Sequence, residues 1–327
     1  KIVRKISLWN DIKVFYALLK LFADSKFDLV YSVTPKAGLL AMLAGYVVRI
    51  RCRIHIFTGQ VWVTRAGMGR LFFKTLDTLL AKLATQVLAD SDSQRQFLID
   101  ENVVQPDKIT VLANGSISGV NLKRFKSDES DRRKKREELG IGDAEVVFLF
   151  LGRFDPDKGI FDLVDAFRLI ADQYASVKLI IVGPDEAGMR GQILSKIGSA
   201  IESLRIVDFT MHPEHYMNAA DIFCLPSYRE GFGSVVIEAA AVGIPAIGSD
   251  IYGIKDAIED GVTGILFPVR DIRALYLAME KMIVDPAGRL KFAQAAHDRA
   301  ERLFSQDDIT SAFIDYCNEA VGSYLVK

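Results

Sequence analysis

Residues 146–153 read VVFLFLGR, and this stretch decides the fold class. Six apolar residues without interruption are typical of a strand that is buried on both faces of a parallel sheet. Similar apolar stretches predict further strands at 178–182, 206–209, 222–225, 245–248 and 264–267. Helix-like segments separate these strands, so this part of the chain is expected to form an α/β domain with a doubly wound sheet.

The N-terminal part of the chain follows the same alternation. Strands are expected at 27–33, 53–57, 86–89 and 109–112, with helices between them. Residues 126–140 are charged and poor in apolar side chains, which is typical of a linker that enters a solvated helix. We therefore expect two Rossmann-like doubly wound domains facing a cleft, residues 1–127 and 128–305, and a C-terminal helix, 306–327, that packs back toward the first domain.

Composition excludes several classes of protein. The three cysteines, Cys52, Cys224 and Cys317, are far apart and lack CxxC spacing, so neither a disulfide framework nor a zinc site is indicated. His212 and His215 are three residues apart, but no other ligand pattern accompanies them and no metal is expected. The sequence also has no uncharged apolar window of about 18 residues, the minimum for a membrane span.

Charge is distributed unevenly along the chain. Residues 1–127 carry 19 Lys and Arg against 9 Asp and Glu, whereas residues 128–327 carry 22 against 33. A basic N-terminal half suggests that it faces something anionic, either nucleic acid or a membrane surface with phosphate-bearing lipids. The alternative is that a basic and an acidic lobe attract each other across a cleft.

A first candidate motif follows the strand at 146–151. Gly152 and Arg153 come directly after it, and Lys158 and Gly159 follow a few residues later. The carboxyl ends of strands face the ligand crevice in a doubly wound sheet, so both cations could bind a diphosphate. A solvated loop with two ordinary surface cations would have the same sequence.

A second candidate motif runs from Glu230 to Gly243. Its glycine-rich loop precedes a helix, and backbone N–H groups at a helix N-terminus bind phosphate well. Glu238 lies about one turn into that helix, and Glu230 lies in the loop. Two carboxylates on either side of such a loop suit a ligand with hydroxyls at both ends and charge in the middle. The alternative is a helix with a chance glutamate at each end.

Four motifs together resemble the retaining family-4 glycosyltransferases of the GT-B fold. They occur in the order Gly152-Arg153 with Lys158-Gly159, then Leu225-Pro226-Ser227, then Glu230-x7-Glu238, then Asp260-Gly-Val-Thr-Gly264. The resemblance covers nearly all of residues 28–325, and it implies an enzyme, a hexosyltransferase that uses a nucleoside-diphosphate sugar. As the donor nucleotide we expect UDP rather than GDP.

The resemblance also implies roles for individual residues. Glu238 should bind the ribose hydroxyls, and Glu230 should hold hydroxyls of the transferred sugar. Arg153 and Lys158 should neutralise the diphosphate leaving group. Backbone groups that assist them should come from Gly152, Gly231, Phe232, Gly233 and Ser234. These enzymes need no divalent metal, and no convincing DxD site is present, so neither a metal nor another cofactor is expected.

The first domain departs from the family pattern in two places. Thr58 occupies the position where many relatives carry a histidine near the reacting sugar, and His55 lies three residues earlier, inside a strand. Thr58 and Gly59 are expected to contact the donor or the acceptor, whereas His55 is not counted as catalytic. Relatives also begin with two more βα units, which nothing upstream of residue 29 supplies, so the N-terminal domain is expected to be incomplete.

The basic lobe suits contact with an anionic bilayer that holds a lipid-diphosphate acceptor. Its basic and aromatic residues are Arg49, Arg51, Arg53, Arg65, Arg70 and Lys74 with Trp62, Phe72 and Phe73. We expect a cytoplasmic protein, peripheral on the inner face of the membrane, with a glycan or polyprenyl-diphosphate-linked acceptor from bacterial surface polysaccharide synthesis. No nucleic-acid motif is evident. The alternatives are a sugar-nucleotide epimerase of the same fold and a non-catalytic sugar-nucleotide-binding protein.

Overall fold

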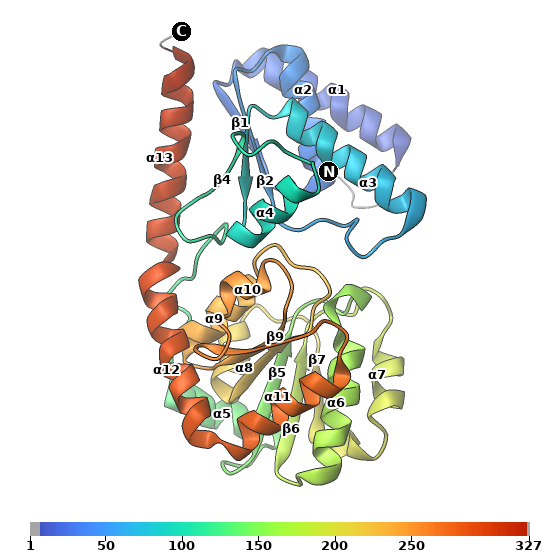
Figure 1. Ribbon diagram of the computed structural model, residues 1–327, viewed down its shortest axis with the longest axis vertical. Helices are drawn as coiled ribbons and strands as arrows, with labels where there is room; N and C mark the ends of the chain where they lie inside the picture. Colours follow the sequence, from blue (N-terminus) through green and yellow to red (C-terminus); the bar gives the residue numbers. More distant parts are fainter. Residues whose placement is uncertain (1–6, 326–327) are drawn as a thin grey trace. The chain divides into compact units, whose positions relative to one another are not determined.

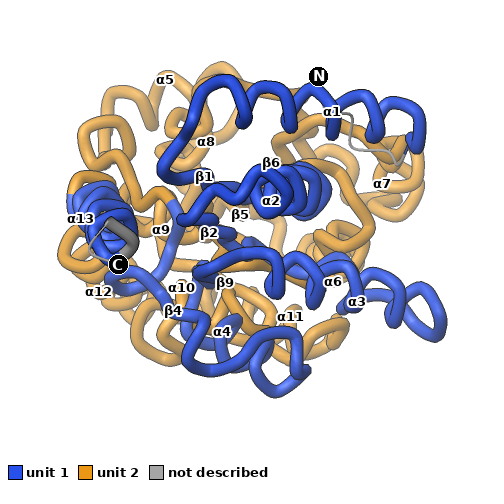
Figure 2. Tube along the Cα trace, turned by 90° about the horizontal axis from the view of Figure 1, so that it is seen from above, with its two compact units in different colours: residues 1–117, 308–327 blue, residues 118–307 orange. Residues whose placement is uncertain are grey.

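The computed structural model describes residues 7–325 and divides the chain into two compact units, each built around its own parallel sheet (Figure 1 and Figure 2). Unit 1 comprises residues 1–117 and 308–327, and unit 2 comprises residues 118–307. The expected α/β class with two parallel-sheet domains is confirmed.

The sheet of unit 1 contains four parallel strands in the order β1-β2-β3-β4. The strands are β1 (Leu29–Ser32), β2 (Cys52–Phe57), β3 (Gln86–Ala89) and β4 (Ile109–Val111). The helices are α1 (Leu8–Ser25), α2 (Pro35–Val48), α3 (Gly67–Leu83), α4 (Asp92–Asp100) and α13 (Gln306–Leu325). Pro35 opens α2 because its missing N–H would be unpaired in the first turn in any case.

Side chains of β2 alternate between two apolar layers of unit 1. Ile54 and Ile56 pack with side chains of α13, including Tyr316 and Ala320. Phe57 lies on the other face, in a cluster with side chains of α2, α3 and α4. Helix α1 packs on α2 in a further layer, so α1, α2 and α3 lie side by side in both views (Figure 1 and Figure 2).

The sheet of unit 2 contains six parallel strands in the order β10-β9-β8-β5-β6-β7. The strands are β5 (Val146–Leu151), β6 (Val177–Val182), β7 (Leu204–Val207), β8 (Ile222–Leu225), β9 (Ala246–Ser249) and β10 (Gly264–Phe267). The α-helices are α5 (Glu129–Leu139), α6 (Ile160–Gln173), α7 (Arg190–Ile197), α8 (Pro213–Ala219), α9 (Ser234–Val242), α10 (Ile254–Ala257), α11 (Ile272–Val284) and α12 (Pro286–Leu303). Two short 3-10 helices are η1 (Pro156–Lys158) and η2 (Gly198–Ser203).

Helices cover both faces of the second sheet. Phe148 and Phe150 of β5 are fully buried in a core that also holds Phe167 of α6 and Leu275 of α11. On the other face α5 packs on α8, α8 on α9 and α9 on α12. Both faces of β5 are therefore shielded from solvent, which is why its sequence is an uninterrupted apolar run.

The division between the units differs from the expected boundary after residue 127. It falls between residues 117 and 118, because the segment that follows pairs with the end of α12. The N–H of Val120 donates to the carbonyl of Phe304 over 2.7 Å, and the N–H of Gln306 donates to the carbonyl of Val120 over 2.9 Å. Residues from 308 onward belong to unit 1.

The cysteine thiols and the hydrophobicity of the helices in the folded chain bear on disulfides and membrane spans. Cys52, Cys224 and Cys317 are all free thiols. Burial raises the pKa of Cys52 to about 11, so this thiol remains protonated at neutral pH. No helix within residues 7–325 combines the length and the apolar character that crossing a lipid bilayer requires.

Candidate active site

The candidate site lies where the strand order of unit 2 reverses. The chain proceeds outward from β5 to β6 and β7, then returns to β8 on the other side of β5 and continues to β9 and β10. Strands β5 and β8 are parallel neighbours, with Phe148 opposite Ile222. The loops that follow them therefore leave the same edge of the sheet next to each other, at the switch point where doubly wound folds bind ligands.

Lys158 and Glu230 meet at this edge. The ammonium group of Lys158 forms an ion pair with Oε1 of Glu230, and the hydroxyl of Ser227 donates to the same oxygen over 3.0 Å. The side chains of Lys158 and Glu230 are only 21% and 16% exposed, so water screens their attraction little. Each of the two sequence motifs thus contributes one residue to this ion pair.

The two loops are held together by close backbone packing. Gly159 has φ +64°, and a Cβ there would collide with the carbonyl oxygen of Pro226. The carboxylate of Asp157 accepts from Nε of Arg229 over 2.6 Å, and its carbonyl accepts from the N–H of Tyr228 over 2.8 Å. The glycine at 159 is therefore required by the approach of the second loop.

Arg153 points to different partners. Its Nη1 lies 3.1 Å from Oε2 of Glu186 and 3.9 Å from Oδ2 of Asp155, whereas Lys158 pairs with Glu230. Gly152 donates its N–H to the carbonyl of Val182 on β6, which fixes the start of this loop. The structure therefore gives the two predicted phosphate-binding cations separate carboxylate partners.

Helix α9 begins beside these loops. Gly233 caps it in the left-handed region with φ +81°, and Ser234 is its first residue. Phe232 is 1% exposed and packs edge-on against Phe304, with ring centroids 5.2 Å apart. The phenylalanine side chain belongs to the core, so a ligand would meet residues 231–234 mainly through backbone N–H groups.

Glu238 lies one turn into α9 and is half-buried. Burial raises its pKa from 4.5 to about 7, and the charge of Glu214 acts in the same direction, whereas the guanidinium of Arg124 lowers it. A carboxyl group with a pKa near neutrality is unusual and is more frequent at functional sites. Glu238 is thus both half-buried and electrostatically coupled to two neighbours.

Arg124 is a residue of this site that the sequence did not single out. It donates to Glu214 through Nε at 2.9 Å and Nη2 at 2.7 Å, and Nη2 also donates to the carbonyl of Met211. It thereby holds the loop before α8 and sets the charge near Glu238. No sequence signal marks this arginine, because its partners lie about 90 residues away and meet it only in the folded unit.

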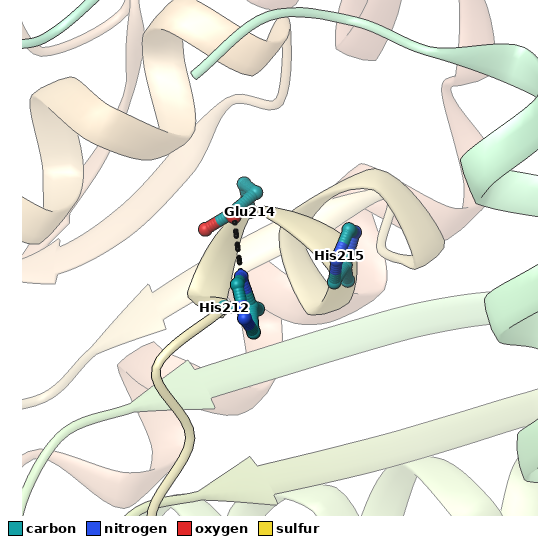
Figure 3. Close-up of side chains that lie close together, drawn as sticks. All are labelled: His212, Glu214 and His215. Carbon is teal, nitrogen blue, oxygen red and sulfur yellow. Dashed lines mark hydrogen bonds and ion pairs between the residues drawn. The ribbon is translucent and has the colours of Figure 1, made fainter. Parts of the chain in front are cut away.

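His212, Glu214 and His215 lie together at the start of α8 (Figure 3). One ligand atom from each falls within 4.8 Å of the others. Nδ1 of His212 lies 3.2 Å from Oε1 of Glu214, and Nδ1 of His215 lies 2.8 Å from the carboxylate of Asp131. Because Arg124 already occupies the other oxygen of Glu214, a cation here would have to compete with a guanidinium for this carboxylate.

Thr58 and Gly59, the other predicted contacts, belong to unit 1, where they follow β2 at the carboxyl edge of its sheet. His55 lies within β2 and is fully buried, with Nδ1 2.8 Å from the hydroxyl of Ser32. Burial lowers its pKa to about 3, so the imidazole is neutral at physiological pH. These features are those of a packed strand residue.

Two α/β units, each around a parallel sheet, and a candidate ligand edge at the switch point of unit 2 are typical of the GT-B fold. The family described as Glycosyl transferases group 1 matches residues 131–299, and a Glycosyl transferase 4-like domain matches residues 2–115. The chain therefore belongs to the group 1 glycosyl transferases. The expected enzyme class, a hexosyltransferase, is confirmed.

Relatives and solved structures agree with this assignment. The capsular polysaccharide biosynthesis glycosyltransferase CapM of Staphylococcus aureus is 28% identical over 98% of this chain and 85% of its own length. A UDP-Gal:alpha-D-GlcNAc-diphosphoundecaprenol alpha-1,3-galactosyltransferase of Escherichia coli is 26% identical over 86% of this chain and 73% of its own length. Anabaena HepE in complex with UDP and glucose shares the fold, with a TM-score of 0.81 and 22% identity over 94% of this chain and 81% of that one.

Proposed function

We propose that this enzyme transfers a hexose from a UDP-sugar, with retention of configuration, to a glycan or polyprenyl-diphosphate-linked acceptor in bacterial surface polysaccharide synthesis. Support for the pathway comes from the relatives, whose names include capsular polysaccharide synthesis and a diphosphoundecaprenol acceptor. The choice of UDP draws on one relative that uses UDP-Gal and on a similar fold with bound UDP. With such an acceptor, the reaction takes place at the cytoplasmic face of the membrane.

The observation that carries the proposal is the pair Lys158–Glu230 at the switch point, beside the N-terminus of α9. A diphosphate at this edge would receive backbone N–H groups of residues 231–234 and the ammonium of Lys158. Glu230 would then turn to hydroxyls of the sugar, and Glu238 would accept from the ribose. Arg153 would leave Glu186, an exposed and therefore weakly held partner, to reach the phosphates.

The chemistry proposed for these side chains is electrostatic. Negative charge grows on the diphosphate as the glycosidic bond breaks, and cations placed there stabilise it without a divalent metal. The leaving phosphate oxygen accepts the proton of the attacking acceptor hydroxyl on the same face of the sugar. Glu230 is assigned no nucleophilic role, because attack on the same face as the departing phosphate needs no covalent intermediate.

Calorimetric titration with UDP, GDP and ADP tests the donor site. We expect UDP to bind with micromolar affinity, equally with and without EDTA, and Lys158→Ala and Glu238→Ala to weaken binding by about 10- to 100-fold. Lys291→Ala, which removes an exposed lysine on α12, is the matched control and should bind as the wild type does. Tight binding of UDP by the Lys158→Ala variant would contradict the proposed site, and loss of binding in EDTA would contradict metal independence.

The stereochemical proposal needs a separate measurement. NMR of the product anomer formed from a UDP-α-hexose should show an α linkage. A β-linked product would contradict retention and leave the donor site unaffected.

A further inference from the structure

Helix α3 of unit 1 has apolar side chains on two faces. One face is buried in the core of unit 1 through Leu80, Ala81 and Leu83. The other face is open to solvent and consists of Met68 (88% exposed), Leu71 (66%), Phe72 (54%) and Leu79 (43%). We call these four residues the α3 stripe. They recur at helical spacing, so they lie along one side of the helix.

The charges beside the α3 stripe have one sign. Arg65 just before the helix and Lys82 in its last turn are exposed. The one acidic residue of α3, Asp77, is 4% exposed and accepts a hydrogen bond from the indole of Trp62 over 2.8 Å. The wider segment 8–83 carries eleven lysines and arginines against four acidic residues. Arg65 and Lys82 therefore attract an anionic partner at the two ends of the α3 stripe.

Other members of the expected basic lobe have structural roles instead. Arg70 and Lys74 both bind the carboxylate of Glu101 at 2.6 Å and lie over the ring of Trp62. Trp62 itself is fully buried. These contacts fix α3 on unit 1, so the α3 stripe is held in place before any partner arrives and little ordering entropy is lost on docking.

We propose that the α3 stripe docks this enzyme on an anionic lipid bilayer. An apolar helical face with basic residues beside it is the arrangement that lies in the plane of a membrane interface, with apolar side chains at the acyl boundary and cations at the phosphates. From Met68 to Leu79 the stripe is about 16 Å long at 1.5 Å per residue. The choice of a bilayer rests in part on the proposed lipid-linked acceptor.

Co-sedimentation of the full chain with lipid vesicles tests the proposal. We expect binding to vesicles of 30% phosphatidylglycerol in phosphatidylcholine, weaker binding to pure phosphatidylcholine, and further weakening as NaCl rises from 0.05 to 0.5 M. The double variant Met68→Gln/Leu71→Gln should bind at least tenfold more weakly, because glutamine keeps helix propensity and removes apolar surface. Lys82→Glu should also bind more weakly.

The matched control is Leu290→Gln. Leu290 is 68% exposed on α12 of unit 2, close to the 66% of Leu71, and this variant should bind vesicles as the wild type does. Equal binding by the double variant, or equal loss in Leu290→Gln, would overturn the proposal. So would sedimentation of the wild type as a dimer that the double variant abolishes, with no vesicle binding, because the α3 stripe would then join two copies of the chain.

A titration with UDP separates this proposal from that of the donor site. The double variant should bind UDP with wild-type affinity, since α3 lies in unit 1 and the proposed nucleotide contacts lie in unit 2. Vesicle binding without UDP binding would contradict the proposed donor site alone, whereas UDP binding without vesicle binding would overturn the docking proposal alone.

Discussion

Lys158 and Ser227 share one oxygen atom of Glu230, Oε1, so the carboxylate expected to hold the sugar is held by the lysine expected to bind the diphosphate. The free enzyme thus neutralises its own phosphate-binding cation. A donor must separate this pair before both groups can engage the ligand, and part of the binding free energy is used for that separation.

Glu230→Gln should therefore separate nucleotide binding from catalysis. The variant removes the charge that competes for Lys158 and places no anion beside the incoming diphosphate, so UDP should bind about three- to tenfold more tightly. Sugar transfer should fall by about 100-fold or more because the sugar loses a charged hydrogen-bond acceptor. Calorimetry with UDP and a steady-state transfer assay measure the two effects. Weaker UDP binding would contradict the competition between Glu230 and phosphate.

Glu238 should make stability depend on pH. Its pKa is about 7 in the folded protein and near 4.5 when unfolded, so its contribution to stability is fully present below about pH 4.5 and is lost as the pH rises through 7. Glu238→Gln removes this dependence. As the pH rises from 5 to 8, the free energy of unfolding of the variant should increase relative to that of the wild type by up to about 3 kcal/mol. Urea denaturation at several pH values measures the difference, and a constant difference would be evidence against the raised pKa.

Gly159→Ala should damage the site and the fold together. The left-handed backbone and the carbonyl of Pro226 leave no room for a Cβ, so we expect a loss of about 2–4 kcal/mol in stability and weaker UDP binding. Gly191→Ala is the control, because nothing lies within 4 Å of a Cβ there and the residue is helical. This control should be neutral or more stable by about 0.5 kcal/mol. Thermal unfolding compares the two.

Arg136→Ala tests the contribution of a buried arginine to the stability of unit 2. Arg136 is 2% exposed and donates to Oδ2 of Asp221 over 2.8 Å and to the carbonyl of Ala219 over 3.0 Å. Its removal leaves a carboxylate and several carbonyls with fewer donors, which should cost about 3–5 kcal/mol. Arg133→Ala removes an exposed arginine of the same helix and should cost less than about 0.5 kcal/mol. Similar losses in both variants would contradict the assigned role.

Sequence patterns predicted the parallel sheets because burial on both faces leaves a plain signal, as in β5. The predicted ends of strands were less accurate. The strand expected at 206–209 spans Leu204–Val207, because an edge strand is shorter and more polar than a central one. The expected domain boundary after residue 127 differs from the division between the compact units after residue 117, because the pairing of Val120 with Ser305 joins segments far apart in the sequence.

The candidate site shows a similar limit. Spacing was enough to select Lys158 and Glu230, since both follow neighbouring strands, and the structure brings them together. Spacing could not reveal that Arg153 faces Glu186, or that Arg124 reaches Glu214, because these contacts depend on loop conformation. Sequence could not separate Trp62, which is fully buried and donates to Asp77, from the exposed Phe72 of the same basic lobe.

Helix α13 covers one face of the sheet of unit 1 with residues that are translated after unit 2. Ile54 and Ile56 of β2 leave the ribosome early, yet the side chains that cover them, such as Tyr316 and Ala320, follow only after the whole of unit 2 has been made. During synthesis the first unit therefore waits with one face of its sheet uncovered, while the second unit, encoded by one continuous stretch, can complete its core first. Completion of unit 1 thus depends on a segment that is synthesised after all of unit 2.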